Sequence, residues 1–241
     1  MLPGMFCRYA LRTTDADAAR VFYAEAIGLA LPDGRTATSA LEAWPLHERA
    51  RAAGAPAHWL GMIGVADVDA MVGRLVERGS QTLGPTARPG DGSAFAVVRD
   101  PTGAVVGVRA PAETVGTSSP VAWHQLHTAD LDRAWATYAE LFGWAHTHTL
   151  DVADPVGGHR LFAWDDAAGP AIGSMANTAR WAGVHSHWLF YFAVADVAAA
   201  VSRVRRLGGT AMEPIELPGA GVLSACEDPQ GAAFGVAGGV P

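Results

Sequence analysis

The phrase AHWLGMIGVADVDA (57–70) is nearly repeated as SHWLFYFAVADVAA (186–199). Each copy opens with a His-Trp pair and runs through an apolar stretch that is typical of a strand. It then reaches an aspartate followed by periodic apolar residues. Asp67 and Asp196 stand where a helix N-cap belongs, so each copy predicts a strand followed by an amphipathic helix. The same strand–helix phrase occurring twice indicates a duplicated fold.

A second phrase is duplicated in the same way. RYALRTTDADAARVFYAEAIGL (8–29) is similar to WHQLHTADLDRAWATYAELFGW (123–144), and both predict a strand, a capped helix and a glycine stop. RDPTGAVVGV (99–108) and EDPQGAAFGV (227–236) place proline and glycine where a type I turn needs them. The predicted helix starts are Asp15, Asp67, Asp130 and Asp196. The chain therefore contains four strand–helix units, grouped in two pairs.

The two pairs of units predict two tandem domains, residues 1–112 and 120–241. The segment PAETVGTSSP (111–120) between them has no apolar periodicity and is the predicted linker. A chain of 241 residues is long enough for two domains that each bury a core.

The two halves differ in the number of residues that separate their duplicated phrases. The second half has room for a pair of strands, at RLFAW (160–164) and AIGSMAN (171–177). The first half instead carries SALEAWPLHERARAAGAP (39–56), whose pattern favours a helix over a paired strand. We therefore expect an abbreviated sheet in the first domain and a fuller one in the second.

Composition excludes several functions. The net charge is −7 and no basic run is present, which argues against nucleic acid as a partner. No apolar run approaches the roughly 18 residues that span a bilayer, so no membrane partner is predicted. All 17 basic residues are arginine, which excludes a Schiff-base or P-loop lysine. With only Cys7 and Cys226 and no secretion signal at the N-terminus, we expect a cytoplasmic protein.

The aspartate caps, the motif LFGW (141–144) and the D-P-x-G hairpins resemble the vicinal oxygen chelate superfamily of glyoxalases, bleomycin-resistance proteins and dioxygenases. In particular, they look like its tandem two-domain branch related to lactoylglutathione lyase. The resemblance implies an α+β fold of two tandem domains, each made of paired βαβββ units that form a curved mixed-sheet cup. It does not imply one reaction, because the superfamily carries many chemistries on this fold.

Metal-dependent members of the superfamily hold a divalent ion in the cup with His, Glu and sometimes Gln. The positions that match by similarity are Arg8, Leu60, Gly107, Trp123, Gly173, Leu189 and Gly235. None of these side chains ligates a divalent ion at neutral pH, so we predict no metal and no cofactor. A register shift of two residues keeps the same face and would bring His58 and His187 to ligand positions, and His127 shares a face with Trp123 and Gln125. A metal-dependent enzyme therefore remains an alternative.

A ligand-binding site is predicted in the second domain. Its predicted residues are Trp123, Gln125, His127, Met175 and Phe190. The first three alternate along one strand and would offer an apolar plane, an amide and an imidazole on one face. Gly173 and Gly235 either leave room for a ligand or make room for a bulky neighbouring side chain.

Strand alternation also assigns directions to the His-Trp pairs. His58 and His187 are predicted to face the cup, mainly as structural caps, whereas Trp59 and Trp188 face the helices. In the first domain, Arg8, Arg12 and Arg109 form an inward anion-binding cluster if all three point into the cup. The alternative, which we favour, is that Arg12 and Arg109 lie at strand ends in water and pair with surface acids.

Two functions from different classes remain. The first is a metal-free protein that binds an apolar or aromatic small molecule, for which eight tryptophans offer flat apolar surface. The alternative is an enzyme, either a lyase or isomerase using His127 or His187, or a metal-dependent glyoxalase or dioxygenase. The expected partner is a small molecule, and the expected state is a monomer with an internal pseudo-dimer or a homodimer.

Overall fold

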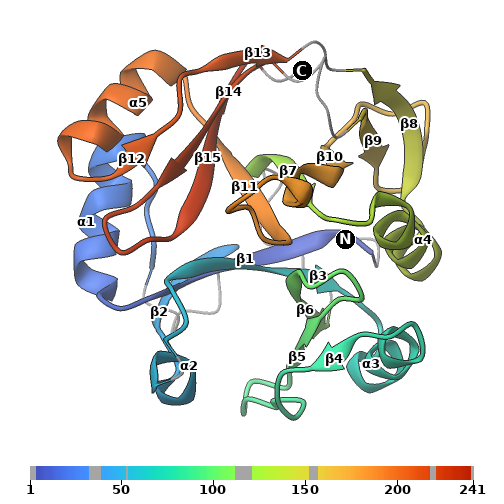
Figure 1. Cartoon of the computed structure of the whole chain (residues 1–241). Coiled ribbons are helices and arrows are strands. Elements are labelled where there is room, and N and C mark those ends of the chain that lie inside the picture. The colour runs from blue at the N-terminus through green and yellow to red at the C-terminus, as the bar shows by residue number, and fades with distance from the viewer. Residues whose placement is uncertain are drawn as a thin grey trace. The chain divides into compact units, whose positions relative to one another are not determined.

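The computed structural model describes residues 4–32, 39–52, 54–111, 121–151, 157–217 and 221–239 (Figure 1). It shows the predicted α+β class, with two tandem domains built on two curved mixed sheets. The predicted linker lies almost wholly outside the described residues, and the predicted domain boundaries remain a prediction. No helix in the described part of the chain is both long and apolar enough to cross a membrane.

The elements of the first half alternate strands and helices. They are β1 (Phe6–Thr13), α1 (Ala16–Ile27), β2 (Leu41–Pro45), α2 (Glu48–Ala52), β3 (His58–Gly64), α3 (Val68–Glu77), β4 (Gln81–Thr82), β5 (Ala94–Arg99) and β6 (Val105–Ala110). The strands form a six-stranded sheet in the order β2-β1-β3-β6-β5-β4.

The second half repeats this plan with more strands. Its elements are β7 (Val121–His127), α4 (Leu131–Phe142), β8 (Ala145–Leu150), β9 (His159–Ala163), β10 (Gly173–Ala176), the 3₁₀ helix η1 (Asn177–Arg180), β11 (His187–Ala193), α5 (Val197–Arg206), β12 (Thr210–Ala211), β13 (Ile215–Leu217), β14 (Gly221–Glu227) and β15 (Ala233–Gly238). The nine-stranded sheet runs β12-β14-β15-β11-β7-β10-β9-β8, with β13 paired to β14. The expected pair at 160–164 and 171–177 is present as antiparallel β9 and β10.

The four predicted helix starts are confirmed. The side chain of each capping aspartate accepts a backbone N–H from the first turn, as Asp67 Oδ1 does from Ala70 at 3.0 Å. Gly28 and Gly143 end α1 and α4 in the left-handed conformation, with φ of 70° and 76°, which a side chain would strain. Local sequence therefore sets where these helices begin and end.

The expected helix over 39–56 is wrong for its first part. Residues 41–45 form β2, which pairs in parallel with β1, and only the short helix α2 follows. Only Leu41, Glu42 and Ala43 alternate between apolar and polar, which is too short a signal to outweigh the helical pattern of the following residues. Pairing with β1 decides the conformation, because it satisfies backbone groups that an isolated segment would leave to water.

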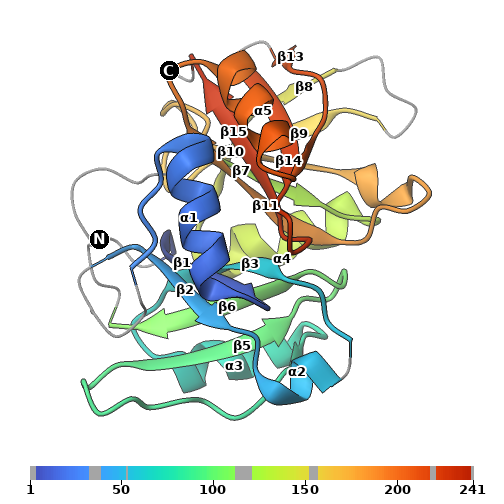
Figure 2. The ribbon, with the colours of Figure 1, turned by 90° about the vertical axis from the view of Figure 1, so that its left-hand side faces the viewer.

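The chain divides into two compact units, and each contains segments of both sequence halves. The α3–α4 unit comprises residues 1–7, 61–114 and 124–188. The α1–α5 unit comprises residues 8–60, 115–123 and 189–241. Within the second of these, α1 lies beside α5 (Figures 1 and 2).

A buried hydrogen-bond chain lies within the α3–α4 unit. The indole Nε1 of Trp188 donates to the hydroxyl of Tyr138 at 3.0 Å, and this hydroxyl donates to Asp100 Oδ2 at 2.9 Å. Trp188 belongs to the repeated His-Trp phrase, Tyr138 to α4, and Asp100 to the D-P-x-G hairpin of the first half. Because all three residues are buried, the chain satisfies polar groups that would otherwise destabilise the core.

The α1–α5 unit contains an equivalent chain of hydrogen bonds, in which the two halves of the sequence exchange roles. Trp59 Nε1 donates to the Tyr23 hydroxyl at 2.9 Å, and this hydroxyl donates to Asp228 Oδ2 at 3.2 Å. The hairpin aspartate now comes from the second half and the tryptophan and tyrosine from the first. The repeated Trp is therefore a core residue with a polar anchor, and the prediction that both tryptophans face the helices is confirmed.

Candidate functional site

The inner face of each sheet is defined here as the face that carries the histidine of the His-Trp phrase. In the second sheet the His187 ring stacks on the His127 ring, with centroids 4.6 Å apart and planes 15° apart. In the first sheet His58 lies close enough to Arg12 for the guanidinium charge to affect its pKa. The neighbouring tryptophans point to helices, so the predicted division of the two side chains is confirmed.

Both histidines are held by the same local hydrogen bond. Nδ1 of His58 lies 2.9 Å from the Pro56 carbonyl oxygen, and Nδ1 of His187 lies 2.8 Å from the His185 carbonyl oxygen. Because a carbonyl only accepts, Nδ1 carries the proton and donates, which leaves a lone pair on Nε2. This supports the predicted structural role, and it adds a hydrogen-bond acceptor on each inner face.

The inner face of the second sheet holds further polar groups in the α3–α4 unit. Pairing of β10 with β7 sets Ser174 opposite Gln125 and Ala176 opposite His127, so these side chains share one face. Ser174 Oγ and His127 Nε2 are buried and have no hydrogen-bond partner among the described residues. Most buried polar atoms are hydrogen-bonded, so two unsatisfied atoms on one face make it a candidate place for a ligand or a water molecule.

The tautomer of His127 follows from its neighbour. Its Nδ1 lies 2.6 Å from Thr178 Oγ1, and this hydroxyl in turn lies 3.5 Å from the Ala176 carbonyl oxygen. When the hydroxyl donates to this carbonyl, His127 Nδ1 donates to Oγ1 and Nε2 keeps its lone pair. In that tautomer the buried Nε2 is an acceptor.

The histidines of this face are neutral at pH 7. Burial, together with the nearby His187, His159 and His185, lowers the pKa of His127 to about 3. Burial also lowers the pKa of His187. His127 and His187 therefore add no positive charge to this face at neutral pH, which suits an uncharged ligand.

The structure places the five predicted site residues in both units. Gln125 and His127 share the inner face of β7 in the α3–α4 unit. Trp123 and Phe190 belong to the α1–α5 unit and are fully buried. The Trp123 Nε1 has no hydrogen-bond partner among the described residues.

Met175 lies on a different face from Gln125 and His127. Its register partner on β7 is Leu126, and residues adjacent along a strand point to opposite sides. Helix α4 contacts β10, and Met175 is fully buried. Among the predicted residues of this unit, the structure therefore brings Gln125 and His127 to one face and leaves Met175 on the other. Sequence alternation could not fix this, because the register between β7 and β10 is set by pairing.

Gly173 and Gly235 make room for aromatic side chains of their own sheet. A Cβ on Gly173 would lie 2.6 Å from Phe162 Cζ, and a Cβ on Gly235 would lie 2.1 Å from Tyr191 Cδ1. Of the two alternatives for these glycines, the structure supports the bulky neighbour, since the rings already occupy the space.

The inner face of the first sheet is polar and charged. Arg12 lies opposite Trp44 in the pairing of β1 with β2, and Ala10 lies opposite Glu42, so Arg8, Arg12, Glu42 and Trp44 share one face. Arg8 Nη1 lies 3.2 Å from Glu42 Oε2 in a buried ion pair. The Arg12 guanidinium lies over the Trp44 ring, 5.7 Å from its centroid.

The predicted interpretation of the three arginines needs correction. Arg109 is only 7% exposed and lies 3.8 Å from Asp91 in the α3–α4 unit, so it is not a strand-end residue in water. Arg8 and Arg12 lie in the α1–α5 unit, and the acid that binds Arg8 is buried. Pairing with a surface acid was predicted for Arg12 and Arg109. Arg109 does pair with the exposed Asp91, although it is itself buried, whereas Arg12 forms no salt bridge with a described acid and lies over the Trp44 ring.

Sequence reasoning missed Glu42, Trp44 and Ser174. The first two were missed because 39–56 was assigned to a helix, and only Leu41, Glu42 and Ala43 alternate as a strand would. Ser174 was missed because the neighbouring glycine was assigned to the inner face. In the register of β10 with β7, the serine takes that position.

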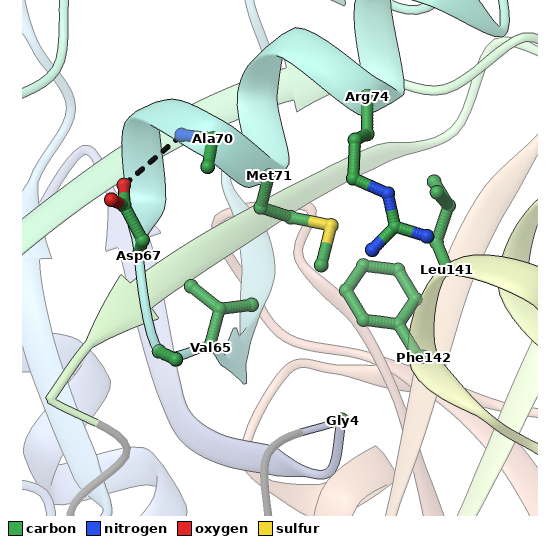
Figure 3. Close-up of a pocket in the computed structure, with 9 residues that line it drawn as sticks. Gly4, Val65, Asp67, Ala70, Met71, Arg74, Leu141 and Phe142 are labelled. Carbon is green, nitrogen blue, oxygen red and sulfur yellow. Dashed lines mark hydrogen bonds between the residues drawn. The ribbon is translucent and has the colours of Figure 1, made fainter.

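A separate pocket of about 310 Å³ lies in the α3–α4 unit (Figure 3). Met71 and Arg74 of α3 line it together with Leu141 and Phe142 at the end of α4. It is built from helix residues and the turn at Gly4 and does not include the inner-face histidines. We assign no role to it in the candidate site.

Comparison with known proteins now identifies the family. Residues 6–108 and 121–236 match the family model described as Glyoxalase/Bleomycin resistance protein/Dioxygenase superfamily. Because these two matches cover most of the chain, the protein belongs to this superfamily. The two matched segments reproduce the duplication seen in the sequence, and the predicted resemblance is confirmed.

Two bacterial relatives are similar over much of their length. The chain is 32% identical over 244 residues to "Putative glyoxylase CFP32" of Mycobacterium bovis, covering 94% of this chain and 91% of that protein. It is 33% identical over 192 residues to "Anthracycline biosynthesis protein DnrV" of Streptomyces peucetius, covering 76% of this chain and 66% of that protein.

Solved structures share the fold at low identity. The Mn(II)-bound glyoxalase from Novosphingobium aromaticivorans superposes with a TM-score of 0.66 at 10% identity, covering 99% of this chain and 83% of that one. The 2,3-dioxygenase LapB from Pseudomonas sp. KL28 gives 0.65 at 12% identity, covering 99% and 92%. At these identities the likeness shows a common fold and no common chemistry.

The residues at the family's metal positions do not fit a divalent ion. Arg8 is a cation bound to Glu42, and Gly107 and Gly235 are covered by the side chains of Met62 and Tyr191. Among the described residues, no group of three or more His, Cys, Asp or Glu side chains is placed to hold a metal ion. Two imidazoles and a hydroxyl on the second inner face are hydrogen-bonding groups and make no complete ligand set.

Proposed function

We propose that the protein binds an apolar or aromatic small molecule, without a metal, on the inner face of the second sheet around His127. One observation carries the proposal: Ser174 Oγ and His127 Nε2 are buried on the same face without a partner among the described residues. Leaving such an atom unsatisfied costs about 1–3 kcal/mol, and a ligand that hydrogen-bonds to it recovers this energy.

The lone pair on His127 Nε2 narrows the ligand class. A neutral imidazole acceptor favours a ligand that donates a hydrogen bond, such as a phenol or another hydroxyl. The Gln125 amide beside it both donates and accepts. A mainly apolar molecule with one hydroxyl group matches a few polar atoms set in an apolar wall.

The pKa of His127 favours binding over acid–base catalysis. A general base works best when its pKa lies near the working pH, whereas burial lowers the pKa of His127 to about 3. The imidazole is then a weak base at pH 7 and a good hydrogen-bond acceptor. The lyase or isomerase alternative through His127 therefore has less physical support than a binding role.

The names of the relatives bear on both candidates. The Streptomyces relative is named for anthracycline biosynthesis, which agrees with a small-molecule ligand. The mycobacterial relative is named a glyoxylase, which favours an enzyme of the glyoxalase type as the second candidate. The cytoplasmic location remains a prediction. The monomeric or homodimeric state is also a prediction, and light scattering would measure it.

Calorimetric titration with 1-naphthol tests the binding proposal. The His127→Phe variant keeps an aromatic ring but removes the acceptor, so we expect 1-naphthol to bind about 3–10-fold more weakly to it. His148→Phe is the matched control, because His148 is an exposed residue of β8, and its affinity should equal that of the wild type. 1-Methoxynaphthalene, which cannot donate, should bind the wild type and His127→Phe equally.

If 1-naphthol bound the wild type and His127→Phe with equal affinity, the binding site would not lie on this face. A parallel assay with the hemithioacetal of methylglyoxal and glutathione, with and without added Mn²⁺, Ni²⁺ or Zn²⁺, tests the second candidate. Turnover that depends on an added ion would favour the enzyme and contradict the metal-free proposal.

A further inference from the structure

The inner faces of the two sheets are repeats that carry different chemistry. In the duplicated phrases 8–29 and 123–144, Arg12 occupies the place of His127. In the duplicated His-Trp phrases, His58 occupies the place of His187. The second face therefore pairs two neutral imidazoles, whereas the first pairs a guanidinium with an imidazole.

Arg12 forms no salt bridge with a described carboxylate. Glu42 lies on the same face and acts on Arg12 through its charge, but it is bound to Arg8 in an ion pair whose side chains are 6% and 9% exposed. The guanidinium of Arg12 instead lies over the ring of Trp44. Arg8, Arg12 and Glu42 together therefore carry one net positive charge.

The environment of Arg12 is partly desolvated. Burial lowers the pKa of its guanidinium, and the charge of Glu42 raises it by a smaller amount. Burial also lowers the pKa of His58, whose Nε2 keeps a lone pair because Nδ1 donates to the Pro56 carbonyl. A guanidinium without a paired acid in such a place is energetically costly, and a bound anion would offset that cost.

We infer that the inner face of the first sheet binds a planar organic carboxylate, with Arg12 as the residue that binds the carboxylate group. The guanidinium lies over the Trp44 ring, 5.7 Å from its centroid, and its planar fork of donors can form two parallel hydrogen bonds to one carboxylate. Trp44 adds apolar surface beside the carboxylate position, and His58 Nε2 offers an acceptor. Arg12, Trp44 and His58 are each only half-buried, which leaves the face accessible.

This site is independent of the one proposed around His127. It lies in the α1–α5 unit and is formed by residues of the first half of the sequence. The inner face of the first sheet favours a negatively charged ligand, whereas that of the second sheet favours an uncharged ligand that donates a hydrogen bond. Failure of either proposal leaves the other intact.

Calorimetric titration of the full chain with 2-naphthoate and its neutral analogue 2-naphthamide tests the inference. The wild type should bind 2-naphthoate at least about tenfold more tightly than the amide, because a charged pair contributes more than a neutral hydrogen bond. Arg12→Gln should lose about 10–100-fold in affinity for 2-naphthoate and lose the preference for charge. Arg12→Lys, which keeps the charge but loses the fork, should fall between the two.

Arg206→Gln is the matched control, because Arg206 is an exposed arginine of α5, and it should bind 2-naphthoate like the wild type. Thermal unfolding of each variant checks that the fold is retained. Wild-type affinity of Arg12→Gln, or failure of 2-naphthoate to bind the wild type at about 1 mM, would overturn the inference. Displacement of 2-naphthoate by an equal concentration of inorganic phosphate would overturn the planar carboxylate as the ligand class.

Discussion

The hydroxyl of Tyr138 donates a 2.9 Å hydrogen bond to Asp100, although the two residues belong to different halves of the duplicated sequence. Tyr138 lies on the helix of the second half, and Asp100 opens the D-P-x-G hairpin of the first. The pair Tyr23 and Asp228 makes the reciprocal contact at 3.2 Å. Each repeated helix is thus tied to the hairpin of the other repeat, and each compact unit depends on both halves.

Replacement of Tyr138 by Phe should destabilise the protein by about 2–4 kcal/mol. The change keeps the ring but removes the hydroxyl, so the buried Trp188 Nε1 loses its acceptor and Asp100 Oδ2 loses its donor. Urea unfolding measures the free energy of unfolding. Tyr23→Phe should give a similar loss through Trp59 and Asp228, and a change below about 0.5 kcal/mol in either variant would contradict the polar-anchor role.

Replacement of Glu42 by Gln should destabilise the protein by about 3–5 kcal/mol, because it removes the carboxylate that forms a buried ion pair with Arg8. Glu213→Gln is the matched control, since it breaks an exposed pair with Arg205 and should cost less than about 1 kcal/mol. The double variant Arg8→Met/Glu42→Leu should recover most of the stability. If Glu42→Gln and the double variant had the same free energy of unfolding, loss of the ion pair would not be the cause of the destabilisation.

Replacement of Gly235 by Ala should destabilise the protein by about 1–3 kcal/mol through overpacking, because the new Cβ would lie 2.1 Å from Tyr191. Gly73→Ala is the control, because this helical glycine of α3 has open space around it, and the change should stabilise by about 0.5–1 kcal/mol. Thermal unfolding compares the two. Restored stability in Gly235→Ala/Tyr191→Leu would identify the ring as the obstacle, whereas a harmless Gly235→Ala would show that the space is free.

The free energy of unfolding should fall as the pH falls from about 6.5 to about 4. Burial lowers the pKa of His127 to about 3 and that of His124 to about 4. In this range the unfolded chain binds protons at both histidines and the folded chain does not, so acid favours unfolding. Each histidine contributes a slope of roughly 1.4 kcal/mol per pH unit in urea unfolding. His127→Gln should reduce the slope by one such increment, and an unchanged slope would show that His127 is not buried as a neutral group.

Local sequence determined the framework of this fold. The aspartate caps, glycine stops and apolar periodicity were sufficient to predict four helices at their observed starts, because these signals act within a few residues. Alternation along the His-Trp strands was likewise sufficient to separate the inward histidines from the helix-facing tryptophans.

Pairing between distant segments decided the rest. The strand β2 exists because β1 satisfies its backbone, and the register of β10 with β7 puts Ser174, not Gly173 or Met175, beside Gln125. Neither fact can be read from one segment, since shifting a strand by a single residue moves every side chain to the other face. The sequence therefore determined which segments fold and which way the repeated His and Trp point. Only the tertiary structure decided which polar atoms share an inner face, because that depends on hydrogen-bonded register between segments about fifty residues apart.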